Sequence, residues 1–101
     1  MSGATEYAKV VRNDSGHRYE IWVGETLAGA SHYRESSEHI VFTHTKVDDS
    51  FSGQGLGSTL VHGALEDANE RGKQIVPVCP FVASFIRENP EFVPHVRWPD
   101  I

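Results

Sequence analysis

The sequence predicts an α/β fold: a mixed sheet of about five strands, antiparallel at first and ending in one strand–helix–strand (βαβ) unit. Two observations predict it. Short β-type runs separated by turn formers fill the first half of the chain, up to Val47. After a glycine-rich loop the hydrophobic period becomes that of a helix, and a second apolar strand begins at Gln74. A connection of this kind joins parallel strands through a right-handed crossover.

Length and composition favour one domain that spans residues 1–101. Of the 101 residues, 39% are hydrophobic and 23% are charged, and the net charge is -5, as in an ordinary globular protein. The acidic balance argues against a nucleic-acid partner, because no basic stripe could neutralise a run of phosphates. No apolar run is long enough to cross a bilayer, and the segment Met1–Glu6 does not look like a signal peptide. With one cysteine in the chain, we expect a cytoplasmic protein.

Four β-type runs precede the glycine loop and predict an antiparallel meander. The turn formers that follow the first run begin at Asp14, and Gly24 and Glu25 suit a two-residue type II′ hairpin loop. The expected strands are Lys9–Asn13, Arg18–Val23, Thr26 to about Tyr33, and His39–Val47.

The fourth run is the longest β signal in the chain. Regular alternation puts one set of side chains on each face, namely Ile40, Phe42, His44 and Lys46 against Val41, Thr43, Thr45 and Val47. Since both sets contain apolar residues, we expect a central strand that is covered on both faces.

Downstream of the loop, the periodicity predicts a helix of about four turns. Its apolar positions form one stripe, made of Leu56, Leu60, Val61, Ala64, Leu65 and Ala68. Arg71 in the last turn and Gly72 just beyond it are matching stop signals. The run Gln74–Val78 then predicts a buried parallel strand. Pro80 opens a second helix, which ends at Asn89 and Pro90.

The glycine loop, Phe51–Ser58, lies between the fourth strand and the first helix. Glycines at Gly53, Gly55 and Gly57 let main-chain N–H groups point into one concavity at a helix N-terminus, which favours a phosphate or pyrophosphate. Gln54 and Ser58 can add side-chain hydrogen bonds to the phosphate oxygens. The alternative is a tight turn that needs glycine only to change direction.

Cys79 lies at the end of the strand that follows the helix. An extended cofactor arm could lie along the preceding strand and pair with main-chain groups near Thr45 and Val47, so that its reactive tip reaches Cys79. A pyrophosphate at one end and a thioester at the other describe acyl-coenzyme A.

These motifs carry a family resemblance over most of the chain, from about Val10 to Phe92. The segment Ser52–Gly57 resembles the coenzyme A loop of the GCN5-related N-acetyltransferases, with Gly55 and Gly57 at the two glycine positions. Ser52 stands where that family has Arg or Gln. Together with His44-Thr45, Val76–Phe81 and Asn89–Phe92, the loop resembles a small subfamily of minimal GCN5-like acetyltransferases, which carry a cysteine after this strand.

The resemblance implies transfer of an acetyl group from acetyl-coenzyme A to an amine, with a cofactor loop and an active-site cysteine. The residues expected to bind the cofactor are Thr45, Val47, Ser52, Gly53, Gln54, Gly55, Leu56, Gly57 and Ser58. Cys79 is the candidate acyl acceptor or proton shuttle, at a junction where the following helix dipole favours the thiolate. The alternative is a small buried hydrophobic residue, the common role of a lone cysteine. In a direct mechanism the amine attacks the thioester without an enzyme intermediate.

His44 is the second catalytic candidate, as a base for the amine or for Cys79; it could equally be a packed strand residue. The remaining histidines lack metal-ligand spacing, so no metal is expected. The acceptor is expected to be a small amine, a polyamine or a lysine side chain, with weak support from the acidic charge. Two other functions fit the same pattern. One is a module that binds coenzyme A with little catalysis, and the other is an interaction domain that has lost the ligand.

Overall fold

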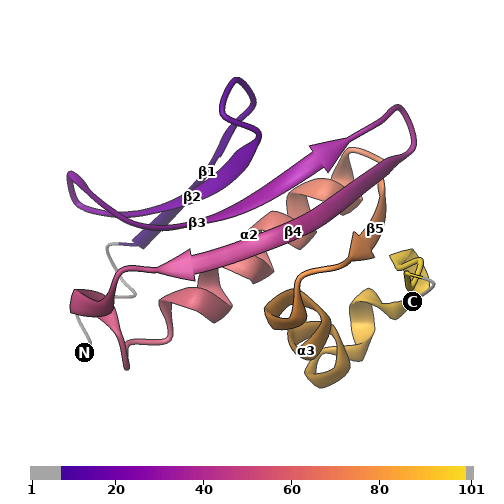
Figure 1. The fold of residues 1–101 in the computed structure, drawn as a ribbon. Helices are drawn as coiled ribbons and strands as arrows, with labels where there is room; N and C mark the ends of the chain where they lie inside the picture. The colour runs from indigo at the N-terminus through magenta and orange to yellow at the C-terminus, as the bar shows by residue number, and fades with distance from the viewer. Residues whose placement is uncertain (1–7, 100–101) are drawn as a thin grey trace.

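The structure, a computed structural model, describes residues 8–99. Five strands, two α-helices and two 3₁₀ segments make up this part of the chain (Figure 1). In chain order they are β1 (Ala8–Asn13), β2 (Arg18–Val23), β3 (Thr26–Glu35), β4 (His39–Val47), a 3₁₀ turn (Asp49–Phe51), α2 (Leu56–Glu70), β5 (Gln74–Pro77), α3 (Pro80–Glu88) and a second 3₁₀ segment (Pro90–His95).

The strands form one sheet in the order β1-β2-β3-β4-β5. The first four pair antiparallel, and β5 pairs parallel to β4, with α2 as the crossover between them. This confirms the predicted meander and βαβ unit. Gly24 has φ 60° in the β2–β3 loop while Glu25 keeps a negative φ, as a type II′ turn requires.

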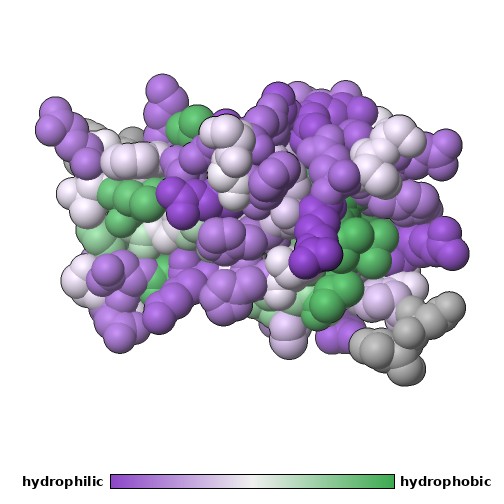
Figure 2. Space-filling view, turned by 45° about the horizontal axis from the view of Figure 1, so that its top comes forward, coloured by the Kyte–Doolittle hydropathy of each residue, from purple (hydrophilic) through white to green (hydrophobic). Residues whose placement is uncertain are grey.

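Both helices pack on the same face of the sheet (Figure 1). Their buried stripes meet the side chains of β2, β3 and β4 in one core, in which the largest fully buried members are Tyr19, Phe42, Ile21, Ile40, Leu56, Leu60, Leu65, Ile75 and Ile86. The expectation that β4 is covered on both faces by apolar packing is therefore wrong. Figure 2 shows the face of the sheet that lies away from the helices. Hydrophilic residues predominate on it, and the hydrophobic patches are small and separated.

The helix boundaries follow the predicted signals. At the end of α2, Gly72 has φ 73°, its N–H bonds to Asn69 O, and Lys73 N bonds to Ala68 O, which is a complete Schellman motif. Helix α3 begins with Pro80 after Cys79 as its N-cap and ends before Asn89. Val82, Phe85 and Ile86 of α3 are buried, whereas Phe81 is 44% exposed.

A β-bulge interrupts β4 and changes which side chains face the core. Its pairing with β3 shifts register between His32 and Tyr33, so that β4 contains one extra residue near Thr43. Phe42 is buried before the bulge, and Thr45 and Val47 lie on the core side after it, whereas His44 and Lys46 are exposed. Regular alternation had placed His44 and Lys46 on the face of Phe42, and the bulge is the physical reason that this prediction is wrong.

Candidate functional site

The loop between β4 and α2 adopts the positive φ angles that its glycines allow. Gly53 has φ 82° and Gly55 has φ 74°, a left-handed conformation that side chains disfavour. Gly57 lies inside the helix, and an added Cβ would lie 2.7 Å from the tip of the Phe81 ring, so that this ring would have to shift. The positive φ angles of Gly53 and Gly55 therefore determine the shape of the loop. Where the loop enters α2, the ring of Phe81 from α3 packs next to Gly57.

The N-terminus of α2 offers main-chain donors to the loop. Gly55 is the N-cap and has no side chain to cap the helix, and the bond from Thr59 N to Gly55 O is 3.2 Å long. The N–H groups of Leu56, Gly57 and Ser58 therefore have no acceptor within the helix, as at any helix start. This arrangement is suited to an anion.

Charged side chains contribute little to the loop, since it is preceded by two acids rather than by a cation. Hydrogen bonds from the backbone and side chain of Ser50 hold the pKa of Asp48 below its ordinary value. Ser52 and Gln54 are exposed, and the Ser52 N–H donates to Asp49 O at 3.1 Å. An anion at this loop would therefore depend on the main chain of α2 and on the glycine positions.

The C-terminal half of β4 has an open edge. Strand β5 pairs only with residues 39–42, whereas β4 continues to Val47. Asp48 N donates to Ala28 O at 2.7 Å, which fixes the alternation of the β3–β4 ladder. The main-chain groups of Thr45 and Val47 consequently point away from β3, toward the side that β5 has left.

Cys79 lies where β5 separates from β4. Its N–H donates to Phe42 O at 2.8 Å, and its side chain is only 3% exposed. The thiol sulfur is 3.5 Å from Thr45 Oγ1. Val78 and Phe81, on either side of it in sequence, are 48% and 44% exposed. The Cys79 sulfur thus lies at the inner end of the open edge of β4.

His44 lies on the other face of the sheet. Because Thr45 points to Cys79, its neighbour His44 points to the open face, where its ring centroid is 6.1 Å from that of His32. Burial, and then the charges of Arg18 and His44, lower the pKa of His32. The structure therefore brings Thr45 to Cys79, and it does not place His44 within reach of the thiol.

Two residues of this region were missed by sequence reasoning. Ser31 is fully buried, and its Oγ is 2.8 Å from Thr45 Oγ1. His32 pairs with His44 in the next position of the ladder. In the sequence, Ser31 follows Ala28, Gly29 and Ala30, and such a run of small residues in a strand indicates close packing rather than a hydroxyl near Cys79.

The family model described as GCN5-related N-acetyl-transferase matches residues 18–96, which include the glycine loop, the open edge of β4 and Cys79. The chain belongs to this family. The family resemblance and the α/β fold predicted from the sequence are thereby confirmed. Members transfer acyl groups from acyl-coenzyme A to amines, so the chain is an acetyltransferase by family, with acetyl-coenzyme A as the implied co-substrate.

Solved structures agree with the fold. A GCN5-like protein from Staphylococcus aureus, solved by NMR and assigned to the N-acetyltransferases, superposes with a TM-score of 0.66 at 22% identity, over 99% of this chain and 94% of that one. Ard1 from Thermoplasma volcanium gives a TM-score of 0.50 at 21% identity, over 56% of this chain and 39% of its own length. No curated protein sequence matches the chain.

None of the helices in residues 8–99 has the length and apolar character needed to span a membrane. Among the same residues, no three His, Cys, Asp or Glu side chains gather as a metal site would require.

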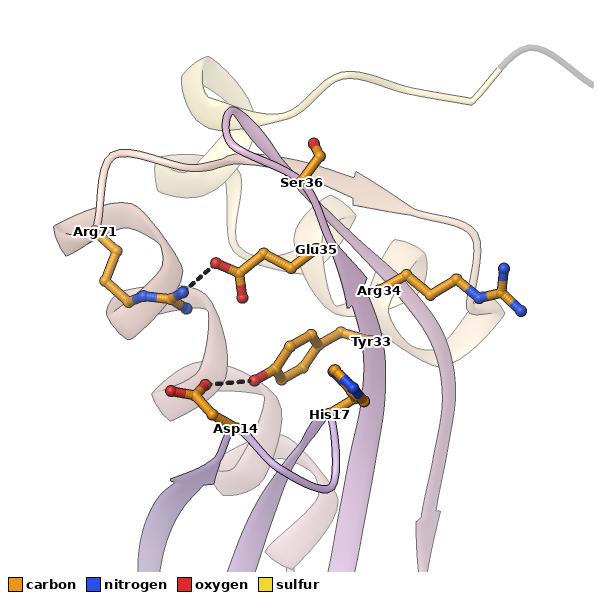
Figure 3. A pocket seen from close by; sticks show the side chains of 7 residues that line it. All are labelled: Asp14, His17, Tyr33, Arg34, Glu35, Ser36 and Arg71. Carbon is orange, nitrogen blue, oxygen red and sulfur yellow. Dashed lines mark hydrogen bonds and ion pairs between the residues drawn. The ribbon is translucent and has the colours of Figure 1, made fainter.

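A cavity of about 730 Å³ lies at the other end of α2 from the glycine loop (Figure 3). Two of its charged side chains, Glu35 and Arg71, pair with each other. Tyr33 donates to Asp14 at 2.9 Å, and Glu35 pairs with Arg71 and, at 2.9 Å, with Lys73. These contacts tie the β1–β2 turn to β3, and the end of β3 to Arg71 and Lys73 just after α2.

This cluster makes stability sensitive to alkaline pH. Burial, followed by the hydrogen bond to Asp14, raises the pKa of Tyr33 to about 12. A raised pKa means that the fold favours the neutral phenol, so this contribution is complete below pH 10 and is lost as the pH rises from about 10 to 12. Denaturant titrations across this range should show the free energy of unfolding falling by no more than about 3 kcal/mol from this group. The free energy of unfolding of the Tyr33→Phe variant should fall less steeply with pH. If it falls as steeply as that of the wild type, the loss of stability does not come from Tyr33.

Proposed function

We propose that this protein is an acetyl-coenzyme A-dependent N-acetyltransferase whose co-substrate lies between the glycine loop and Cys79. The observation that carries the proposal is the open edge of β4, which begins at the bulge and ends at the glycine loop. At about 3.3 Å per residue, the unpaired segment 43–47 offers roughly 16 Å of free main chain. An extended amide-containing arm can pair with Thr45 and Val47 there, with its phosphates at the N-terminus of α2.

The acyl end of the substrate then lies next to Thr45 and Cys79. The Thr45 N–H faces the open edge and can donate to the thioester oxygen, where negative charge develops during attack. In the covalent route, Cys79 sulfur bonds to the carbonyl carbon while the bond from that carbon to the coenzyme A sulfur breaks. The proton of Cys79 leaves with coenzyme A. The amine nitrogen then bonds to the carbonyl carbon of acetyl-Cys79 while the bond from that carbon to the Cys79 sulfur breaks, and the proton that the nitrogen loses in this step restores the thiol.

The amine is proposed to approach from the open face of the sheet, which no helix of the described part covers. His44 lies on that face, one residue before Thr45 and away from Cys79, and can accept the extra proton of a protonated amine as the amine enters from this face, before the attack on acetyl-Cys79. A lysine side chain or a polyamine fits the acidic net charge of -5. We propose a cytoplasmic location for the same reason that the sequence suggests it, namely the single cysteine.

Calorimetry with coenzyme A, followed by acetyl-transfer assays over a panel of amines, tests the function. Binding together with turnover on at least one amine is expected. Binding without turnover, and without an acetylated enzyme, would instead show a coenzyme A-binding module. The absence of any coenzyme A binding would overturn both and leave an interaction domain.

His44→Gln should lower kcat about a hundredfold or more if the imidazole is the base for the amine, because general-base catalysis contributes that much. The dissociation constant for coenzyme A should not change, since the side chain points away from the open edge. His39→Gln, on the same strand, is the matched control and should behave as wild type. Equal kcat values for His44→Gln and His39→Gln would show that His44 is a surface residue.

A further inference from the structure

Two hydroxyl groups next to Cys79 have no part in the function proposed above. Thr45 Oγ1 lies 3.5 Å from Cys79 Sγ, and the same oxygen lies 2.8 Å from Ser31 Oγ. Ser31 and Thr45 are direct partners in the β3–β4 ladder. Since Ser31 is fully buried and Cys79 is 3% exposed, the three groups form a line of polar atoms that runs from inside the sheet to the sulfur.

A cross-strand Ser–Thr pair often serves only to stabilise a sheet. Stabilising the sheet accounts for the hydrogen bond between the two hydroxyls. It does not require the second contact, between Thr45 Oγ1 and the thiol of Cys79. The position of the pair is a consequence of the bulge in β4, which turns Thr45, rather than His44, toward Cys79. The bulge therefore places a hydroxyl, and not an imidazole, at hydrogen-bonding distance from the sulfur.

We propose that Ser31 and Thr45 are positioning residues for Cys79, forming a two-hydroxyl chain that orients the sulfur and donates to it when it is negatively charged. The inference deepens the proposed function, on which it rests, since it concerns the covalent route through Cys79. Hydrogen bonds to a charged acceptor are the strong ones, and the buried setting of the chain increases their effect.

The hydrogen bonds of this two-hydroxyl chain reverse their direction when Cys79 loses its proton. In the resting state the Cys79 S–H donates to Thr45 Oγ1. Either oxygen of the Ser31–Thr45 pair can be the donor. When the sulfur loses its proton, the Thr45 O–H turns to donate to it, and the Ser31 O–H donates to Thr45 Oγ1. Neither hydroxyl takes up the proton, which leaves with coenzyme A. Thr45 therefore acts through its side chain on Cys79 and through its N–H on the substrate.

The test measures the rate at which iodoacetamide alkylates Cys79 in the full chain and compares this rate between the wild type and its variants. Acetyl transfer is a second measurement. Thr45→Val keeps the shape and removes the hydroxyl, and it should slow alkylation roughly tenfold to a hundredfold, the usual effect of a hydrogen bond to a charged group. Thr45→Ser should restore the rate. Ser31→Ala should act in the same direction and more weakly. In transfer assays, kcat should fall while KM for acetyl-coenzyme A stays unchanged.

Thr43→Val is the matched control, because Thr43 is exposed on the same strand and its hydroxyl lies 3.4 Å from His32 O, away from Cys79. It should alkylate at the wild-type rate. The proposal falls if Cys79 is alkylated at the wild-type rate in Thr45→Val, or if its alkylation in Thr45→Ser is as slow as in Thr45→Val. Failure of the covalent route is a separate result: wild-type protein would never become acetylated by acetyl-coenzyme A, while the alkylation series would still support the hydroxyl chain.

Discussion

Replacing Cys79 with alanine is expected to lower acetyl transfer about a hundredfold or more, because the two-step route loses its acyl acceptor and leaves only direct attack by the amine. The dissociation constant for coenzyme A should stay the same, since the glycine loop and the edge of β4 are unchanged. Transfer rates and calorimetry on the same preparations measure the two quantities separately.

A buried cysteine also contributes to packing, so the variant needs a control for lost volume. Val82→Ala removes buried carbon from the first turn of α3, close in sequence to Cys79. It should cost stability, by about 1–3 kcal/mol, and keep most of the transfer activity. If Cys79→Ala retains as much activity as Val82→Ala, the acetyl group passes directly to the amine and Cys79 is a core residue.

Replacing Gly55 with alanine should weaken coenzyme A binding by at least about tenfold. A side chain in the left-handed conformation costs roughly 1–2 kcal/mol, so the loop would move away from the shape that directs its N–H groups to the phosphates. Gly55 has open space around its missing Cβ, and the effect should therefore come from the backbone. Calorimetric titration with coenzyme A measures it.

Gly24→Ala is the matched control for this change. Gly24 also has a positive φ with nothing within 4 Å of an added Cβ, and it lies in the β2–β3 hairpin. Both variants should lose similar amounts of stability, whereas only Gly55→Ala should lose affinity. Equal affinities in the two variants would mean that the glycine loop is a turn without a ligand.

Much of the fold could be predicted because its signals are local. The helical period of α2, the stop signal at Gly72 and the proline that opens α3 each act within a few residues of themselves. The glycine loop was predictable for the same reason, since Gly53 and Gly55 adopt the positive φ angles that glycine allows. Pairing order followed from short loops and from the crossover rule.

The residues that surround Cys79 could not be predicted, because they depend on the register between β3 and β4. A bulge of one residue has no clear sequence signature, yet it reverses the faces of every side chain that follows it. For this reason alternation placed His44 beside Phe42, whereas the structure has Thr45 on the core side. Ser31 becomes significant only through the same register, as the partner of Thr45.

Intact-mass spectrometry after incubation with acetyl-coenzyme A tests the central claim most directly. The wild-type chain should gain a single acetyl group, and Cys79→Ser should gain none under the same conditions, because a serine hydroxyl is a far weaker nucleophile than a thiolate. Loss of the adduct on addition of an amine would complete the cycle. An adduct that persists in Cys79→Ser, or a wild-type chain that remains unmodified, would contradict the account.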